Sequence, residues 1–592
     1  MESQPEVRQL LGEGRGRTLS RRAFVARAAA LGVSASSVTA ILAACGSAST
    51  APANTPAATT AAAPAATAPG VVPAASSSAA ASSAPTAAAD KPPKRGGTLK
   101  VALNSDITGV DSQFGTATVT LQTMAHVYEY LFTLDEKNNF VPMLADKMDT
   151  SADGKTFTIA LRKGVKFHND TEMTADDVVA SLGRWQRTSS RAKVLLTDLD
   201  GITATDKQTV TVAFKRPNGA FFSALSIPNQ QVIVLPKAII EKNRDPSGKD
   251  LQITDKDAIG TGPYKLQSWV PDRSVKMVRF EGYTARTDPT SGLGGKRQAN
   301  VDAIEFIPVP DDQTRLSGLI SGEYHVASTV ASALYDQIKG NSALVPYIVK
   351  PGSGVTGVFN KKHGPFIESD AGRKLRQAVL ASTDPIKVMA GTVDNPLFYR
   401  TIPALAGPEW SFWYNEAGKD IYGKRDLAKA KQLMAEAGYK GEEIRWITTK
   451  DYDYMYRSAL VASEQMKEAG FNVKLVVSDW PTVVSNRGKP EVYEIFTTGI
   501  GFTGDPTGTA AFTPEWPGWN TSTRNAANYQ ALINETDPNK RKQLFVEQQQ
   551  IFWEEVPYMQ FGEQFGLRAA RKEVKGFSNA SEFFVWNAWL DQ

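Results

Sequence analysis

Residues 141–185 read VPMLADKMDTSADGKTFTIALRKGVKFHNDTEMTADDVVASLGRW and contain a strand signal followed closely by a helix signal. Apolar side chains recur at every second position of residues 155–162, which predicts a half-buried strand. Thr174 is of a type that caps helices, and an apolar stripe follows at helical spacing from Val178 to Trp185. We therefore expect a strand and then a helix, the alternation typical of α/β folds.

The same alternation returns further along the chain. Asp426 opens the stretch DLAKAKQLMAEAGY, whose apolar residues share one helix face and whose Gly438 is placed to close the helix. Residues 458–470 repeat this design, and a strand is predicted at 473–477, directly after Gly470. The interleaving predicts α/β lobes, and a length of 592 residues predicts more than one domain.

Several residues that resemble site residues have structural explanations. Gly260 and Gly262 in GTGPY suit a tight backbone path into a strand. We expect His168 to be a structural hydrogen bonder, and the acidic pairs at 176–177 and 311–312 to cap helices or to face solvent. The histidines are too scattered to predict a metal site: they are His126, His168, His325 and His363. No metal and no cofactor are expected.

Composition restricts the class of protein. Hydrophobic residues make up 42% and charged residues 22% of the chain, as in proteins with sizeable cores. The net charge is +4, and residues 1–44 contribute six arginines against three glutamates, so the remainder carries +1. This near neutrality argues against a nucleic-acid partner. Beyond the opening segment the sequence has no run of 18 apolar residues, so no membrane-spanning helix is predicted there.

The first 94 residues predict export and anchoring. The pair Arg21–Arg22 precedes a weakly apolar stretch and resembles a twin-arginine signal, so residues 1–44 are predicted to be a signal peptide. Leu42–Cys45 resembles a lipobox, in which the thiol of Cys45, the only cysteine of the chain, takes a lipid. Residues 46–89 carry no charge and are nearly all Ala, Ser, Thr, Pro and Gly. Residues 45–94 are therefore predicted to be the lipid-attachment residue and a disordered tether with a reach of roughly 40 Å.

The remaining sequence resembles the family 5 extracellular solute-binding proteins of ABC transporters, which include oligopeptide, dipeptide and nickel binders. The resemblance is most specific in the stretch at 141–185. It covers essentially all of residues 95–592, in order, through the following segments: RGGTLKVAL (95–103), VYEYLFTLD (127–135), GTGPYKLQSWVPDRSVKMVRFEGY (260–283), VDAIEFIPVPDDQTRLSGLISGEYHVA (301–327), GPFIESDAGRKLRQAVLASTD (364–384) and VPYMQFGEQFGLRAARKEVKGF (556–577).

The resemblance implies an α/β fold of the type II periplasmic-binding-protein kind, with two lobes, a hinge and an extra inserted domain. Domain I is expected at 95–140, 258–350 and 560–592, domain II at 141–257 and domain III at 351–559. A solute would bind between the lobes, which close over it. The partners implied are a permease and its ATPase. The protein is expected to be a monomer and not an enzyme. It is expected outside the cytoplasm, on the cell membrane or in a periplasm.

The stretch EVYEIFTTGIGFTGDPTGTAAF (491–512) bears on the ligand. In peptide-binding relatives an aromatic residue and an aspartate here hold the ammonium group of the peptide, and Gly501, Phe502 and Asp505 resemble that motif. Asp505 runs straight into Pro506, whereas relatives place a second acidic residue before the proline. Asp505 therefore matches either the ammonium partner or a turn-forming Asp-Pro, and we expect the ammonium role.

Aromatic residues gather in loop-like segments near this stretch and are candidates for lining the site. Such rings line peptide pockets and also stack on sugars, and core packing is the alternative for each ring alone. The candidates are Trp410, Phe412, Trp413, Tyr414, Trp480, Trp516 and Trp519.

Other functions find less support in the sequence. Ser190–Lys193 has the S-x-x-K spacing of penicillin-interacting enzymes, but the accompanying S-D-N and K-T-G sequences are missing from the chain. A ligand-free sensor or scaffold leaves no motif. We expect a receptor for a small solute, most of all a peptide, with an oligosaccharide or a metal chelate as the alternatives.

Overall fold

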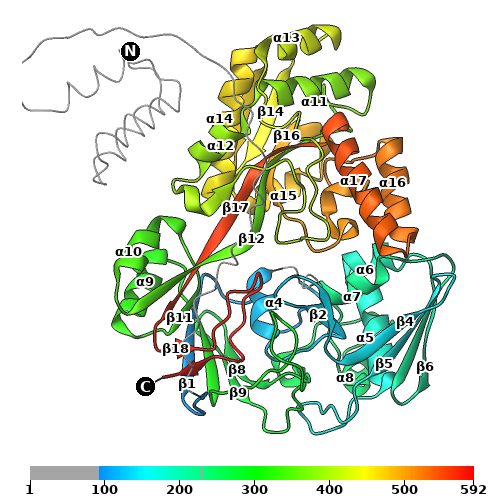
Figure 1. The fold of residues 1–592 in the computed structure, drawn as a ribbon, viewed down its shortest axis with the longest axis vertical. Coiled ribbons are helices and arrows are strands. Elements are labelled where there is room, and N and C mark those ends of the chain that lie inside the picture. The colour runs from blue at the N-terminus through cyan, green and yellow to red at the C-terminus, as the bar shows by residue number, and fades with distance from the viewer. Residues whose placement is uncertain (1–91, 116, 228–230, 592) are drawn as a thin grey trace, which may run out of the picture. The chain divides into compact units, whose positions relative to one another are not determined.

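An eleven-stranded mixed sheet organises the part of the chain that the computed structural model describes, residues 92–115, 117–227 and 231–591 (Figure 1). Ten strands follow one another across the sheet, and the short β13 (Tyr399–Arg400) pairs separately with β17. Their order is β15 (Asn472–Val477), β14 (Glu443–Thr448), β16 (Ile495–Ile500), β12 (Leu344–Phe359), β17 (Tyr558–Arg571), β11 (Val326–Val330), β1 (Thr98–Leu103), β10 (Ala303–Pro308), β9 (Ser274–Arg279) and β8 (Tyr264–Val270).

Two long antiparallel strands connect the two ends of this sheet. β12 has 16 residues and β17 has 14, so β12 spans about 50 Å at the usual rise per residue. One end of the β12–β17 ladder pairs Leu344 with Arg571, the other pairs Val358 with Tyr558, and the register shifts between Val349 and Ser353. We call the strands β15, β14 and β16 with their helices the β14 half, and the strands β11, β1, β10, β9 and β8 with theirs the β1 half. The domain boundaries expected near residues 350 and 560 fall inside these two strands.

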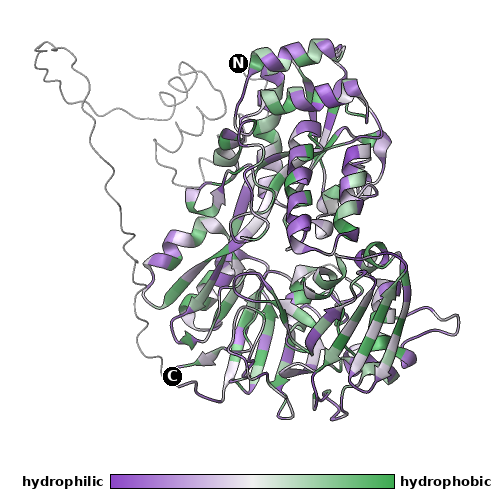
Figure 2. Ribbon diagram, turned by 45° about the vertical axis from the view of Figure 1, so that its right-hand side comes forward, coloured by the Kyte–Doolittle hydropathy of each residue, from purple (hydrophilic) through white to green (hydrophobic). Residues whose placement is uncertain are grey.

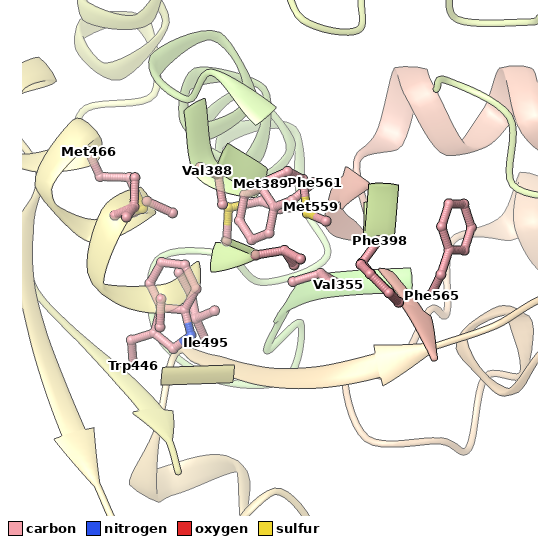
Figure 3. Packing of buried hydrophobic residues seen from close by; sticks show 14 of the residues in the cluster. Val355, Val388, Met389, Phe398, Trp446, Met466, Ile495, Met559, Phe561 and Phe565 are labelled. Carbon is pink, nitrogen blue, oxygen red and sulfur yellow. The ribbon is translucent and has the colours of Figure 1, made fainter. Parts of the chain in front are cut away.

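The β14 half is built as parallel β/α units. β14 pairs in parallel with β15 and with β16. Helices cover it: α11 (Asp370–Ser382), α12 (Pro385–Thr392), α13 (Leu427–Glu436), α14 (Asp453–Ala469), α15 (Trp480–Asn486), α16 (Thr523–Asn534) and α17 (Pro538–Glu555). Figure 3 shows part of the core between strands and helices, where the buried Trp446 packs near Met466 and Ile495. Hydrophobic and hydrophilic residues alternate along the helices and strands around this core (Figure 2).

The β1 half carries a second sheet. Its four antiparallel strands lie in the order β4 (Ala145–Thr150), β5 (Thr156–Leu161), β7 (Thr209–Phe214) and β6 (Leu199–Asp206), all within the residues expected to form domain II. The helices of that segment are α5 (Ala175–Thr188), α6 (Ser190–Leu195), α7 (Phe221–Ser226) and α8 (Lys237–Lys242). Elsewhere in this half lie α4 (Thr118–Met124), α9 (Asp312–Ser321), α10 (Tyr335–Gly340) and the strand pairs β2 (Phe132–Leu134) with β3 (Phe140–Pro142) and β18 (Val574–Lys575) with β19 (Trp589–Leu590).

The local elements predicted from the sequence are present. α5 begins after Thr174 with a capping box to Asp177, and Asp426 caps α13 by accepting a hydrogen bond from Lys429 N at 2.9 Å. α14 ends at Gly470 in the left-handed conformation as expected, but it begins at Asp453, five residues before the predicted start.

The structural roles expected for the glycines and for His168 are confirmed. A Cβ atom at Gly260 would lie 2.0 Å from the carbonyl oxygen of Val127, so only glycine fits. His168 bonds through Nε2 to the Gly262 carbonyl oxygen at 3.0 Å and accepts from the Gly260 amide through Nδ1 at 3.2 Å. Within the described ranges there is no cluster of metal-ligating side chains and no helix long and apolar enough to cross a membrane. Cys45, the arginine pair and the tether as far as residue 91 lie outside those ranges.

Candidate functional site

The loop that follows β16 occupies a position where α/β sheets bind ligands. Its residues 501–505 leave the carboxyl end of β16, beside β14, which runs parallel to it. Ligands of open α/β sheets bind outside the carboxyl ends of parallel strands. Gly501 and Phe502 are half-buried in this loop, so the fold places both residues predicted from the sequence where a solute could contact them.

Phe502 belongs to an aromatic group that joins three segments of the β14 half. Its ring centroid lies 5.6 Å from that of Trp410, 6.3 Å from Trp413 and 5.4 Å from Phe545 of α17. Trp413 also donates from its indole nitrogen to the carbonyl oxygen of Gly504 at 2.9 Å. The loop with Trp410 and Trp413 is thereby fixed against the loop after β16.

These loops contact the β1 half. Asn138 donates from its side-chain amide to the carbonyl oxygen of Glu409 at 3.0 Å. A Cβ atom at Gly504 would lie 3.4 Å from the side chain of Ile227. Trp410 and Trp413 belong to the same hydrophobic cluster as Tyr130 and other core residues of the β1 half. The aromatic group therefore lies at the junction between the two halves.

Asp505 is engaged by groups of the protein itself. Its side chain is 3% exposed, and its Oδ2 accepts from Nη2 of Arg541 on α17 at 2.6 Å. Its Oδ1 accepts from the amide of Thr507 at 2.9 Å and from the Thr507 hydroxyl at 2.6 Å, so Asp505 caps the short turn that begins at Pro506. This geometry supports the alternative in which Asp505 is the turn-forming Asp-Pro, because its carboxylate is already paired with the guanidinium of Arg541.

A second guanidinium acts on the same carboxylate. Burial lowers the pKa of Arg191 on α6 to about 10, and the negative charge of Asp505 opposes that shift. Gly508 comes close to this side chain, because a Cβ atom there would lie 3.4 Å from Arg191 Nη2. Asp505 thus connects α17 of the β14 half electrostatically with α6 of the β1 half.

Among the other aromatic candidates, Phe412 joins this group, because its ring centroid lies 4.9 Å from that of Trp413, and the remaining candidates make their contacts elsewhere. Trp516 and Trp519 pack with the core cluster around Phe496, and Trp519 is buried beneath the ammonium of Lys362, 4.8 Å from the ring centroid. Trp480 lies at the start of α15, where its ring meets that of the exposed Tyr452 at 5.4 Å. Tyr414 is half-buried and donates its hydroxyl to Glu416, and Phe412 is 39% exposed. The structure therefore divides the expected aromatic cluster into separate groups.

Three buried polar atoms around the loop after β16 have no hydrogen-bond partner among the residues described. They are Nε1 of Trp410, Oγ1 of Thr503 and Oγ1 of Thr509. Buried donors and acceptors are nearly always paired, so each of these atoms calls for a partner. A bound solute or an ordered water would supply one.

A small cavity in the β1 half contains further polar groups of this kind. It leaves about 20 Å³ for the centre of a water-sized group. Ser112 Oγ and both side-chain polar atoms of Gln231 are buried there without a partner in the described part of the chain. Glu582 also lines it and accepts from Gln122 Nε2 at 3.1 Å. The remaining walls are Leu121, Ala125, Tyr130, Leu293, Phe583 and Trp586.

The sequence did not indicate these residues. Ser112, Gln231 and Glu582 are separated by more than a hundred residues each, and none stands in a recognisable motif. Burial raises the pKa of Glu582, while the hydrogen bond from Gln122 and the charge of Arg568 lower it in part.

A charged cluster lies where the long strands change register. Arg400 donates from Nε to Glu563 of β17 at 2.6 Å and from Nη1 to Glu409 at 2.8 Å. Glu563 in turn accepts from the amide of Gly352 in β12 at 2.6 Å. Burial raises the pKa of Glu563, and Arg400 opposes this effect. The cluster ties both long strands to the loop that carries Trp410.

Comparison with known proteins assigns this architecture to a family. The family model for bacterial extracellular solute-binding proteins, family 5, matches residues 139–522. A probable peptide ABC transporter periplasmic-binding protein of Sinorhizobium fredii is 27% identical over 523 residues, which cover 84% of this chain and 93% of that protein. A glutathione-binding protein of Salmonella choleraesuis is 25% identical over 504 residues, which cover 81% of this chain and 91% of that protein.

Solved structures show the same fold. The periplasmic binding protein DppA of Helicobacter pylori, in complex with the peptide STSA, superposes with a TM-score of 0.69 at 21% identity, covering 84% of this chain and 99% of that one. The structure is thus of the type II periplasmic-binding-protein kind, as expected from the sequence.

Proposed function

Because the chain belongs to family 5 of the bacterial extracellular solute-binding proteins, we propose that the solute it captures is a peptide. The chain is the solute-binding component of an ABC importer and not an enzyme; it acts outside the cytoplasm, with a membrane permease as its partner. One observation above all supports a peptide as the solute: a relative named for peptide transport is 27% identical to this chain over 84% of its length.

The peptide binds at the junction between the two halves. The loop after β16 and the loop with Trp410 present unpaired polar atoms beside aromatic rings there. A ligand that touches both halves favours a closed arrangement in proportion to the contacts made only in that arrangement. β12 and β17 are the connections between the halves, so we place the hinge where their register shifts, near Val349 and Ser353.

A lipid on Cys45 holds the receptor at the membrane, and the Arg21–Arg22 pair directs its export. The support is the sequence Leu42–Cys45 and the uncharged tether behind it. Cys45→Ala protein should lose membrane partitioning in cell fractionation, and Arg21→Lys with Arg22→Lys should block export. Normal processing and partitioning of Cys45→Ala would refute the anchor, and undiminished export of the double variant would favour the general secretory route.

Mass spectrometry of small molecules that co-purify with the native protein tests the peptide directly. We expect peptides to be released on denaturation, and calorimetry with those peptides to reproduce binding. Recovery of an oligosaccharide or a metal chelate instead would overturn the peptide proposal and assign the aromatic rings to sugar or chelate binding.

Calorimetry also decides the part that Asp505 plays. If Asp505 is the ammonium partner, Asp505→Asn should remove the preference for peptides with free over acetylated amino termini. Retention of that preference by the variant would leave Asp505 with the turn-forming role that its contacts with Thr507 and Arg541 support.

A further inference from the structure

The carboxyl-terminal end of α16 is completed by a residue of the other half. The last carbonyl groups of a helix have no partner within the helix. Here Nη1 of Arg541 on α17 donates to the carbonyl oxygens of Leu532 and Glu535. The carbonyl oxygen of Ile533 accepts from the amide of Gly219 at 2.7 Å. Gly219 lies in the segment expected to form domain II, so this hydrogen bond crosses the junction between the two halves.

Only glycine fits at position 219 in this contact. A Cβ atom there would overlap the carbonyl group of Glu535, approaching its carbon to 2.5 Å, and would lie 2.8 Å from Nη1 of Arg541. These nearest atoms all belong to the β14 half. The backbone of Gly219 is outside the left-handed region, so alanine can adopt its conformation when the halves are apart. The contact between the halves therefore requires the glycine, and the fold of its own loop does not.

The loop that presents Gly219 is held in place by its own half. The backbone amide of Asn218 donates to the carbonyl oxygen of Gly154 at 3.1 Å, and its side-chain amide donates to that of Leu195 at 2.7 Å. The side-chain oxygen of Asn218 accepts from the amide of Ala220 at 3.1 Å. A loop that is already ordered loses little conformational entropy when it meets its partner.

The contact lies away from the two strands that connect the halves. Figure 1 shows α16 above α6 and α7 on the right, whereas β12 and β17 cross between the halves further to the left. A groove beside the contact has walls from both halves, with Pro217 on one side and Ala531 and Thr536 on the other. Rotation about the hinge proposed in β12 and β17 would therefore separate Gly219 from α16.

Arg541 joins this contact to the loop after β16. Its Nη1 reaches the end of α16, and its Nη2 donates to Asp505 at 2.6 Å. One side chain thus spans from the loop where we place the solute to the residues that meet Gly219.

We propose that Gly219 and the carboxyl-terminal end of α16 form a latch, with which the segment expected to form domain II holds the halves closed. The latch rests on the proposed function, since it acts on a solute captured between the halves. Gly219 is a positioning residue, because it acts through the arrangement of the halves and not through contact with the solute. The latch raises the affinity for every solute by the same factor, since it raises the fraction of protein in the closed arrangement.

Calorimetry on Gly219→Ala tests the latch, with Gly201→Ala as the matched control. Gly201 lies in β6 of the same segment, and a Cβ atom there would meet nothing within 4 Å. The probes are synthetic tripeptides that differ in their side chains. Gly219→Ala should weaken the binding of each tripeptide by the same factor, roughly tenfold or more, because a hydrogen bond is lost and the neighbouring contacts are separated. Gly201→Ala should bind as wild type does. Unchanged affinity, or a loss that differs between tripeptides, would overturn the latch.

Small-angle X-ray scattering separates the latch from the proposed function. The full chain, carrying Cys45→Ala to remove the predicted lipid, is measured as purified, with any solute that it has retained. Gly219→Ala should have a larger radius of gyration than wild type and Gly201→Ala, at unchanged far-ultraviolet circular dichroism. If no tripeptide binds wild type and the radii differ, the peptide function fails and the latch stands. Equal radii would refute the latch, and binding of the tripeptides by wild type would then leave the peptide function standing.

Hydrogen exchange of wild type decides the case in which Gly219→Ala does not fold. A tripeptide that binds should slow the exchange of the segment that contains the Gly219 amide, because closure returns this amide to the Ile533 carbonyl oxygen. Unchanged exchange of that segment would refute the latch.

Discussion

The ion pair between Asp505 and Arg541 should contribute to the stability of the fold, and its burial determines how large that contribution is. Its side chains are 3% and 6% exposed. Removing one partner of such a pair leaves a buried charge without compensation, which costs about 3–5 kcal/mol. Residues 93–592 form one compact unit of about 500 residues. At about 2.1 cal/mol/K per residue, the unfolding entropy of this unit is about 1 kcal/mol/K. Asp505→Asn should therefore lower the melting temperature by roughly 3–5 °C.

Asp311 provides a matched control for this experiment. It caps α9 by accepting from the amide and the hydroxyl of Thr314, both at 2.8 Å, as Asp505 does with Thr507, but it faces solvent. Asp311→Asn should cost at most about 1 kcal/mol, since asparagine is also a good cap. The difference between the two variants isolates the ion pair from the cap.

Differential scanning calorimetry of four proteins completes the cycle. Asp505→Asn and Arg541→Met should each destabilise, and the double variant should be more stable than the sum of the two effects predicts. A loss below about 1 °C for either single variant, or strict additivity in the double variant, would refute the argument that Asp505 is committed to Arg541.

Three further predictions concern stability. Burial lowers the pKa of His126 to about 4, so this histidine is protonated in the unfolded chain before it is protonated in the folded protein as the pH falls. Between pH 7 and pH 4 the free energy of unfolding of wild type, measured by urea titration, should fall by about 3 kcal/mol more than that of His126→Gln, and equal losses would contradict this. Gly260→Ala should destabilise by about 1–3 kcal/mol because its methyl group meets the Val127 carbonyl oxygen, and a wild-type midpoint in the same titration would contradict that contact. Arg400→Met should lower the free energy of unfolding by about 1–3 kcal/mol, because Arg400 bridges two glutamates that the variant leaves without this partner. Thermal melts would detect the loss, and an unchanged melting temperature would contradict it.

The local elements were predictable because their signals are local. The capping box of Thr174 and Asp177 lies within four residues, and the glycine that ends α14 follows its last apolar turn. The start of α14 was missed because its N-cap residue, Tyr452, makes no capping hydrogen bond through its side chain and so gives no start signal, although Tyr454 and Met455 of the first turn already pack into the core. Helix starts are hardest to place where no capping residue marks them.

The site was less predictable because tertiary contacts decide it. The motif around Asp505 fits two roles in sequence, of which the ammonium role was expected, and the position of Arg541, 36 residues away, supports the turn-forming role. The cavity brings together Ser112, Gln231 and Glu582 from distant parts of the chain, and no local pattern encodes that meeting. The aromatic residues were expected to gather because they stand in loop-like segments around residues 491–512, yet their side chains pack into different cores.

The path of β12 and β17 has a consequence for how this chain can be re-engineered. The β14 half is one continuous segment, and it leaves and re-enters the rest of the molecule at Ser353 and Gln564, which are paired across the ladder. Paired residues of antiparallel strands lie about 5 Å apart. The segment is therefore a module with adjoining ends, and it can be transplanted between relatives as a single cassette without rerouting the recipient chain.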